Sequence, residues 1–295
     1  EAGRPAVLLH GDFAGNGTRM LVEAAYDVDG ALYTLRARSD IAARVPAVSR
    51  KFPRNDAFAR ADIVAVFGEK PVTEARRYEA DNFASGVFLS RADGTYRFEA
   101  LPRDAQIAPI HGIAAIDFDG DGHLDIVATQ NTDSAIPRFH GGLGVLLAGR
   151  GDGGFEARRP EASGVLLTGN GRALVPIPGG DDGRPGLFAT RHGGTSELFE
   201  PQDDDVTWLE IRLHDGSAPG NRAGVGARVD LLRSDGRTTH HEIALGGGWL
   251  SQSAPVVHAS FSSGSRVVEA NVRWPDGRTS RHTNVPERGR WILSR

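Results

Sequence analysis

The chain has 295 residues, of which 39% are hydrophobic and 24% are charged, a composition that supports packed cores and argues against an intrinsically disordered protein. Its formal net charge of −4 argues against a nucleic-acid-binding protein, because such domains carry a basic surplus. The absence of cysteine excludes disulfide scaffolds, thiolate metal sites and cysteine nucleophiles, and no run reaches the about 18 apolar residues of a membrane-spanning helix.

Glycine is spread along the whole chain, with 38 residues, and together with aspartate it separates short apolar runs. This texture predicts many short strands joined by tight turns. The first such unit lies near the N-terminus, where the turn 12–20 stands between the apolar runs 7–9 and 21–22. We therefore expect two strands here, joined by an acidic, glycine-containing turn.

Residues 39–82 show a helical pattern instead, and we expect a three-helix insertion there. Ser39 and Asn55 are residue types that cap helix N-termini, and Gly68 is of the type that ends helices. The helices are predicted over residues 40–44, 56–67 and 73–80.

The strongest acidic turn, residues 117–125, is flanked by the apolar runs 113–116 and 126–128, and a weaker copy spans 178–186. These two turns begin 61 residues apart, whereas the first and second begin 105 residues apart. The excess of 44 residues equals the length of the insertion 39–82. The recurrence of strand, turn and strand indicates an internal repeat of roughly 60 residues.

A second texture follows the acidic residues 203–205. From Trp208 onward apolar and polar residues alternate, and turn signals separate about seven predicted strands between residues 207 and 294. This pattern predicts a separate all-β domain, a small sandwich or barrel. The domain organisation expected from the sequence is a repeat region at 1–202, an acidic linker at 203–206 and a β-domain at 207–295.

The turn 117–125 has the spacing of a hard-cation loop. Carboxylates stand at its positions 1, 3, 5 and 9 and a glycine at position 6, so that alternate side chains of a curling chain point inward. Ala128 at position 12 and the flanking strands exclude an EF-hand, which needs a glutamate there. Calcium is the cation that this spacing favours. The predicted ligands are the side chains of Asp117, Asp119, Asp121 and Asp125 and the main-chain carbonyl of His123.

The other two turns have fewer suitable oxygens. The first has Asp12 and Asn16, and the third has Asp182 alone. We therefore predict that both are structural turns without metal.

The sequence contains no recognised catalytic motif, neither His-Glu-x-x-His nor a Gly-x-Ser-x-Gly elbow nor a phosphate-binding loop. His111 could line a pocket with Gln106, Asn131 or His140, although a structural histidine is the commoner case. The turn 246–253 carries Trp249 among glycines and serines, and two interpretations stay open for it: a ligand-binding surface or a tryptophan that fills the core of the small domain.

Two resemblances emerge from these motifs. The loop 117–125 between apolar strands resembles the calcium-binding FG-GAP/VCBS repeat, and three later stretches resemble the ASPIC/UnbV domain. The combination is similar to bacterial relatives of cartilage acidic protein. The resemblance implies a mainly β protein, with blades of an integrin-α-like β-propeller, partial or complete, followed by the small β-domain. The three ASPIC/UnbV-like stretches are residues 220–228, 246–253 and 272–278.

The function implied is a secreted, periplasmic or cell-surface protein of the adhesion type that binds Ca²⁺ and a protein or glycan ligand. A propeller needs more blades than the three or so repeats present, so a partner chain is one way to complete the ring. Our leading hypothesis is a non-enzymatic, calcium-stabilised interaction module without a membrane span. The alternative is an enzyme of natural-product or polysaccharide metabolism, with a pocket between the helical insertion and the propeller face and with His111, Asp133 and Arg138 as candidate residues.

Overall fold

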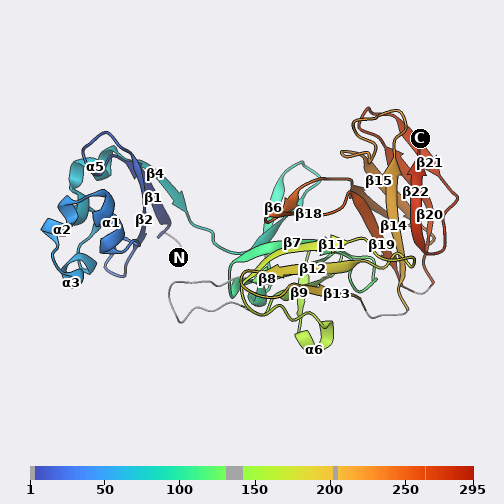
Figure 1. Ribbon diagram of the computed structural model, residues 1–295, viewed down its shortest axis with the longest axis horizontal. Coiled ribbons are helices and arrows are strands. Elements are labelled where there is room, and N and C mark those ends of the chain that lie inside the picture. Colours follow the sequence, from blue (N-terminus) through green and yellow to red (C-terminus); the bar gives the residue numbers. More distant parts are fainter. Residues whose placement is uncertain (1–3, 131–141, 202–204, 263) are drawn as a thin grey trace. The chain divides into compact units, whose positions relative to one another are not determined.

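The computed structural model in Figure 1 describes residues 4–130, 142–201, 205–262 and 264–295. Contacts divide the chain into two compact units, residues 1–83 and residues 84–295, which are described separately below. The described chain is mainly β, as the sequence predicted. No helix in the described ranges combines the length and the apolar composition of a membrane-spanning segment.

Unit 1 is built on a four-stranded antiparallel sheet in the order β3-β2-β1-β4. Its first two strands are joined by the predicted acidic turn, which confirms the expectation for this segment. Alternate residues of the central strands, among them Val7, Leu9, Val22 and Ala24, are buried in one core with residues of the helices. The strands are β1 (Ala6–Gly11), β2 (Met20–Tyr26), β3 (Leu32–Thr34) and β4 (Arg76–Ala80).

The insertion between β3 and β4 is helical, but its helices are shorter and more numerous than predicted. The expected helix over 56–67 is wrong, because Asp62 begins a new helix there: its Oδ1 accepts the Ala65 N–H at 2.6 Å. Gly68 does end that second helix, with φ of +91°. The helices are α1 (Arg38–Arg44), α2 (Ala47–Lys51), α3 (Asn55–Ala59), α4 (Ile63–Phe67) and α5 (Glu69–Glu74).

Two further helix expectations fail. Ser39 and Asn55 lie inside α1 and α3 and do not cap them; Asn55 instead accepts a hydrogen bond from Arg38. The helix expected over 73–80 is largely a strand, since residues 76–80 form β4 along the edge of β1. Backbone pairing with a distant strand outweighs local helix propensity there.

Unit 2 begins with two antiparallel sheets, in the orders β10-β9-β8-β7 and β11-β12-β13, and a separate hairpin of β5 and β6. Both remaining acidic turns join neighbouring strands, as predicted: one joins β7 to β8 and the other β11 to β12. The elements are β5 (Gly86–Ser90), β6 (Tyr96–Ala100), η1 (Arg103–Gln106), β7 (Ile110–Ile116), β8 (Asp125–Gln130), β9 (Val145–Gly149), β10 (Phe155–Arg158), α6 (Pro160–Ser163), β11 (Gly171–Ile177), β12 (Gly186–Arg191) and β13 (Glu197–Phe199).

The two sheets pack against each other along β7 and β11 (Figure 1). The fully buried Thr129 on β8 links three strands: its hydroxyl accepts the Gly112 N–H at 2.8 Å and donates to the Arg172 carbonyl at 3.2 Å. A shared core that includes Ile116, Leu146 and Leu174 fills the space between the sheets. No sheet in the described ranges closes on itself, so the structure does not confirm propeller blades.

The C-terminal part of unit 2 is a sandwich of two sheets, in the orders β19-β14-β22 and β16-β15-β20-β21. Their facing sides form one core that includes Ile211, Leu231 and Trp274, each at most 1% exposed. Between residues 205 and 295 the described chain contains no helix, in agreement with the predicted all-β domain. The strands are β14 (Thr207–His214), β15 (Arg228–Arg233), β16 (Thr238–Glu242), β17 (Gly247–Gly248), β18 (Ser251–Gln252), β19 (Val256–Phe261), β20 (Val267–Arg273), β21 (Thr279–His282) and β22 (Gly289–Ser294).

Two isoleucines on the neighbouring strands β14 and β22 test this core. Ile211→Ala should lower the free energy of unfolding by about 2–5 kcal/mol, because the Ile211 side chain is fully buried. Ile292→Ala makes the same deletion on a side chain that is 58% exposed, and we expect a loss of less than about 0.5 kcal/mol. Urea denaturation of both variants measures the difference, and equal losses would contradict the sandwich assignment.

Candidate metal centre

The turn between β7 and β8 brings three aspartates together. Asp117 directly follows β7, and Asp125 is the first residue of β8. One carboxylate oxygen each from Asp117, Asp119 and Asp125 lies within 4.8 Å of the others. Asp121 belongs to the same turn but not to this cluster; its carboxylate accepts the His123 N–H at 2.7 Å. The proposed carbonyl ligand of His123 stays a prediction.

Backbone N–H groups hold two of the acidic side chains in place. Asp125 is fully buried, and its two oxygens accept the Phe118 and Gly149 N–H groups, each at 2.8 Å. Asp117 is 9% exposed, and its Oδ2 accepts the Gly122 N–H at 2.9 Å. Asp117 Oδ1 is buried and has no hydrogen-bond partner. A buried carboxylate oxygen without a partner is costly, because it has lost its water and gained nothing in exchange.

Burial disturbs the titration of both residues. It raises the pKa of Asp117 to about 7 and that of Asp125 to about 6, and neighbouring carboxylates add to the effect. At neutral pH such a cluster favours a bound positive charge, either protons or a cation. The donor set is made of carboxylate oxygens, the ligands that Ca²⁺ prefers, so the residues fit a hard divalent cation.

The other two acidic turns use their carboxylates differently. Asp12 accepts the Asn16 and Gly17 N–H groups at 3.2 and 2.7 Å, and Asp182 accepts the Arg184 N–H at 3.1 Å. These hydrogen bonds stabilise the turns themselves. Within the residues that the structure describes, only the turn of Asp117 gathers three acidic side chains.

The acidic turn also packs against the C-terminal sandwich. Ser260 on β19 donates from its hydroxyl to the Asp117 carbonyl at 3.2 Å, across 143 residues of sequence. A Cβ placed at Gly120 would lie 2.5 Å from Val206, and one at Gly122 would collide with the guanidinium of Arg233. The turn therefore fits closely against the sandwich. No local sequence pattern indicates this contact, because it joins residues far apart in the chain.

The third acidic turn, residues 178–186, also packs against the sandwich. A Cβ at Gly183 would lie 2.8 Å from the Gly289 carbonyl oxygen and 3.0 Å from that of Trp208.

On this outer face of the sandwich Glu210 is fully buried and bound by Arg212 and Arg290. Burial alone would raise the pKa of Glu210, but the two guanidinium groups hold it below its usual value.

The candidate catalytic residues do not converge on the acidic turn. The His111 ring lies 4.9 Å from that of Trp249, which is 45% exposed, so the interpretation of this tryptophan as a core residue is wrong. Gln106 donates to the carbonyls of Ser85 and Leu101. The remaining candidates, Asn131, Asp133, Arg138 and His140, lie outside the described residues. The pocket expected beside the helical insertion stays a prediction.

Two glycines with positive φ test how tightly the turn fits. Gly236→Ala places a side chain at φ of +83° with no atom nearby, and we expect a loss of about 1–2 kcal/mol in unfolding free energy. Gly122→Ala meets a similar backbone cost at φ of +91° and must also displace Arg233, so the loss should be larger by about 1–3 kcal/mol. Equal midpoints of urea denaturation for the two variants would contradict the close fit.

The raised pKa of Asp117 predicts that the free energy of unfolding depends on pH when a chelator keeps the protein free of metal. Between the unfolded value of 3.8 and the folded value of about 7, the unfolded state releases the proton that the folded state keeps. The stability of the wild type relative to Asp117→Asn should therefore fall as pH rises from about 4 to about 7, by up to about 1.4 kcal/mol per pH unit. Denaturation across this pH range measures it, and Asp182→Asn serves as the exposed control. If the difference in unfolding free energy between the wild type and Asp117→Asn did not change with pH, the prediction would be contradicted.

Comparison with known protein families matches residues 216–295 to the family described as ASPIC and UnbV. The match covers most of the sandwich and confirms the C-terminal part of the resemblance. The comparison matches no FG-GAP/VCBS repeat in the chain. Comparison with curated proteins gives no match for the chain. Residues 216–295 therefore form an ASPIC/UnbV domain.

Proposed function

We propose that the protein is a non-enzymatic, calcium-stabilised interaction module of the FG-GAP/ASPIC type, secreted or displayed at the cell surface. The observation that carries the proposal is the acidic cluster, in which Asp117 Oδ1 is buried without a partner beside oxygens of Asp119 and Asp125. A divalent cation would supply the missing interaction and offset the mutual repulsion of the carboxylates.

The role of the cation would be structural. Asp117, Asp119 and Asp125 would hold it, with Asp121 and the His123 carbonyl as further ligands from the same turn. Neutralising the cluster stabilises the turn between β7 and β8, on which Ser260 and Arg233 of the sandwich rest. Calcium suits this irregular set of oxygens better than magnesium, which demands near-ideal octahedral geometry and retains several waters.

The interaction role is supported by the ASPIC/UnbV domain and by its exposed apolar turn. Trp249 is 45% exposed and Leu250 is 86% exposed, the latter at φ of +52°. An exposed aromatic side chain among polar and glycine residues is typical of surfaces that bind a protein or a glycan. A partner chain that supplies further sheets belongs to the same proposal, because the sheets described here do not close.

Calcium binding should appear as thermal stabilisation. At about 100 times its dissociation constant Ca²⁺ adds about 2.7 kcal/mol to the folded state. For a unit of this size that corresponds to a rise in Tm of about 5–10 °C over a sample in EDTA. Asp119→Asn removes an exposed ligand and should abolish most of this rise with little effect in EDTA, whereas Asp182→Asn in the third turn should retain it.

Scanning calorimetry of the three proteins in CaCl₂ and in EDTA provides the measurement. Superimposed melts of the wild type in the two buffers would refute the calcium assignment. An equal loss of the rise in both variants would place the effect outside the β7–β8 turn.

A further inference from the structure

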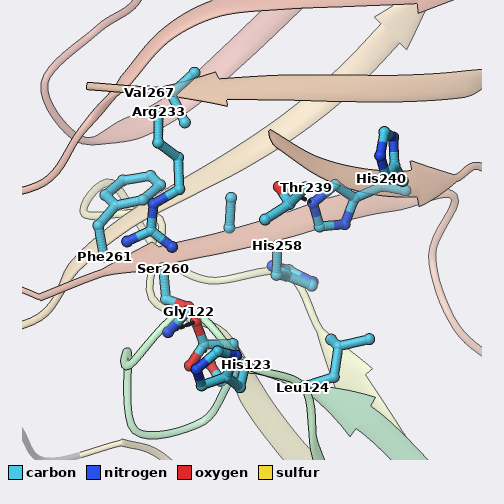
Figure 2. Close-up of a pocket in the computed structure, with 13 residues that line it drawn as sticks. Gly122, His123, Leu124, Arg233, Thr239, His240, His258, Ser260, Phe261 and Val267 are labelled. Atoms are coloured by element: carbon cyan, nitrogen blue, oxygen red, sulfur yellow. Dashed lines mark hydrogen bonds between the residues drawn. The ribbon is translucent and has the colours of Figure 1, made fainter. Parts of the chain in front are cut away.

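A cavity of about 270 Å³ lies at an open side of the sandwich. It is bordered by β16 and β19, the edge strands of the two sheets, and residues Gly122 to Leu124 of the acidic turn line it as well (Figure 2). The size is close to the lower limit of small-molecule sites in proteins. The calcium proposal gives this cavity no role.

Arg233 supplies a buried positive charge to the cavity. Its side chain is 5% exposed, and Figure 2 shows the guanidinium turned toward Ser260 and Gly122. Nε donates to Ser265 Oγ at 3.2 Å and lies 4.0 Å from an Asp235 oxygen. Among the described residues the two terminal nitrogens have no hydrogen-bond acceptor. A buried guanidinium with open donors is suited to a planar, bidentate anion such as a carboxylate.

His258 supplies a second open polar group. Both of its ring nitrogens are buried and have no hydrogen-bond partner. Burial lowers the pKa of His258 to about 4, so at neutral pH the ring is uncharged and offers one donor and one acceptor. The neighbouring His241 differs, because its Nε2 already bonds to the Thr239 hydroxyl at 2.9 Å. Because buried polar groups in proteins are usually hydrogen-bonded, we expect a polar partner for this imidazole inside the cavity.

Apolar side chains form another part of the lining, beside the polar residues His123, Thr239 and His240. Phe261 and Val267 come from the sandwich core, and Leu124 comes from the acidic turn. The Phe261 ring also lies 5.6 Å from the guanidinium carbon of Arg233, so the charged and apolar parts of the cavity are adjacent. Such a lining matches a molecule with one charged end and a small apolar body.

We propose that this cavity binds a small organic carboxylate that carries a second polar group. Arg233 binds the carboxylate, Phe261 and Val267 contact the apolar body, and His258 bonds to the second polar group. Figure 2 shows Arg233 and His258 entering from two different strands, β15 and β19, so the two ends of the ligand are recognised by separate elements.

Asp117 is the acidic residue of the lining, and its charge opposes an anionic ligand. Its Oδ2 is held by the Gly122 N–H, within the acidic cluster that a cation would neutralise. Carboxylate binding should therefore be tighter in Ca²⁺ than in EDTA. This enhancement rests on the proposed function, but the site itself does not.

The probe is 4-hydroxybenzoate, titrated into the full chain by calorimetry in CaCl₂ and in EDTA. 4-Hydroxybenzamide lacks the charge and should bind at least tenfold more weakly, while benzoate lacks the hydroxyl and should bind about fivefold more weakly. Arg233→Gln should abolish the first difference and His258→Phe the second. Arg281→Gln, which changes an exposed arginine on the opposite edge strand β21, should leave both differences unchanged.

His258→Phe keeps an aromatic ring at this position and removes two unpaired buried nitrogens, so it should fold even if Arg233→Gln does not. The proposal is overturned if 4-hydroxybenzoate fails to bind in both buffers, if the amide binds equally well, or if His258→Phe keeps the preference for the hydroxyl. Binding that is equal in CaCl₂ and EDTA would support the site and remove only its link to calcium, which the thermal melts test independently.

Discussion

The burial of two carboxylates in one short turn is the constraint on which the rest of unit 2 depends. Asp117 and Asp125 are nearly or fully removed from water, and no basic side chain pairs with either in the described structure. Backbone N–H groups satisfy three of their four oxygens and leave Asp117 Oδ1 open. A buried carboxylate of this kind needs a compensating positive charge, and the cation that we propose for this turn would provide it.

The position of this turn extends its effect to the domain beyond it. The Asp117 carbonyl accepts the Ser260 hydroxyl, and Gly122 has no side chain where Arg233 packs. A change in the conformation of the turn would therefore alter its contacts with β15 and β19 of the sandwich. The third turn makes a similar contact through Gly183. In the described structure this third turn gathers no group of three acidic side chains, so of the two turns only the one between β7 and β8 has the donor set for the proposed cation.

The sequence predicted what local chemistry determines. Glycine and aspartate impose turns, and so all three acidic turns with their flanking strands were found. The local pattern predicts helix at 76–80, but these residues form a strand because they pair with β1, some 70 residues earlier. Trp249 was ambiguous for the same reason, since its neighbour His111 lies on a distant strand. The spacing also predicts Asp121 as a ligand; one of its carboxylate oxygens accepts the His123 N–H, and its ligand role stays a prediction.

Arg233 and His258 could not be identified from sequence, because neither stands in a motif and each belongs to a regular β-strand. What sets them apart is the geometry at the open side of the sandwich, where edge strands of the two sheets border a cavity with the acidic turn. A well-packed core would fill that space with apolar side chains. Here the chain instead places a guanidinium and an imidazole there, each with nitrogens that bond to no described residue. Polar groups left open at such a position are a feature of recognition sites, and the shared Gly122 contact means that a ligand in the cavity and a cation in the turn would stabilise the same backbone.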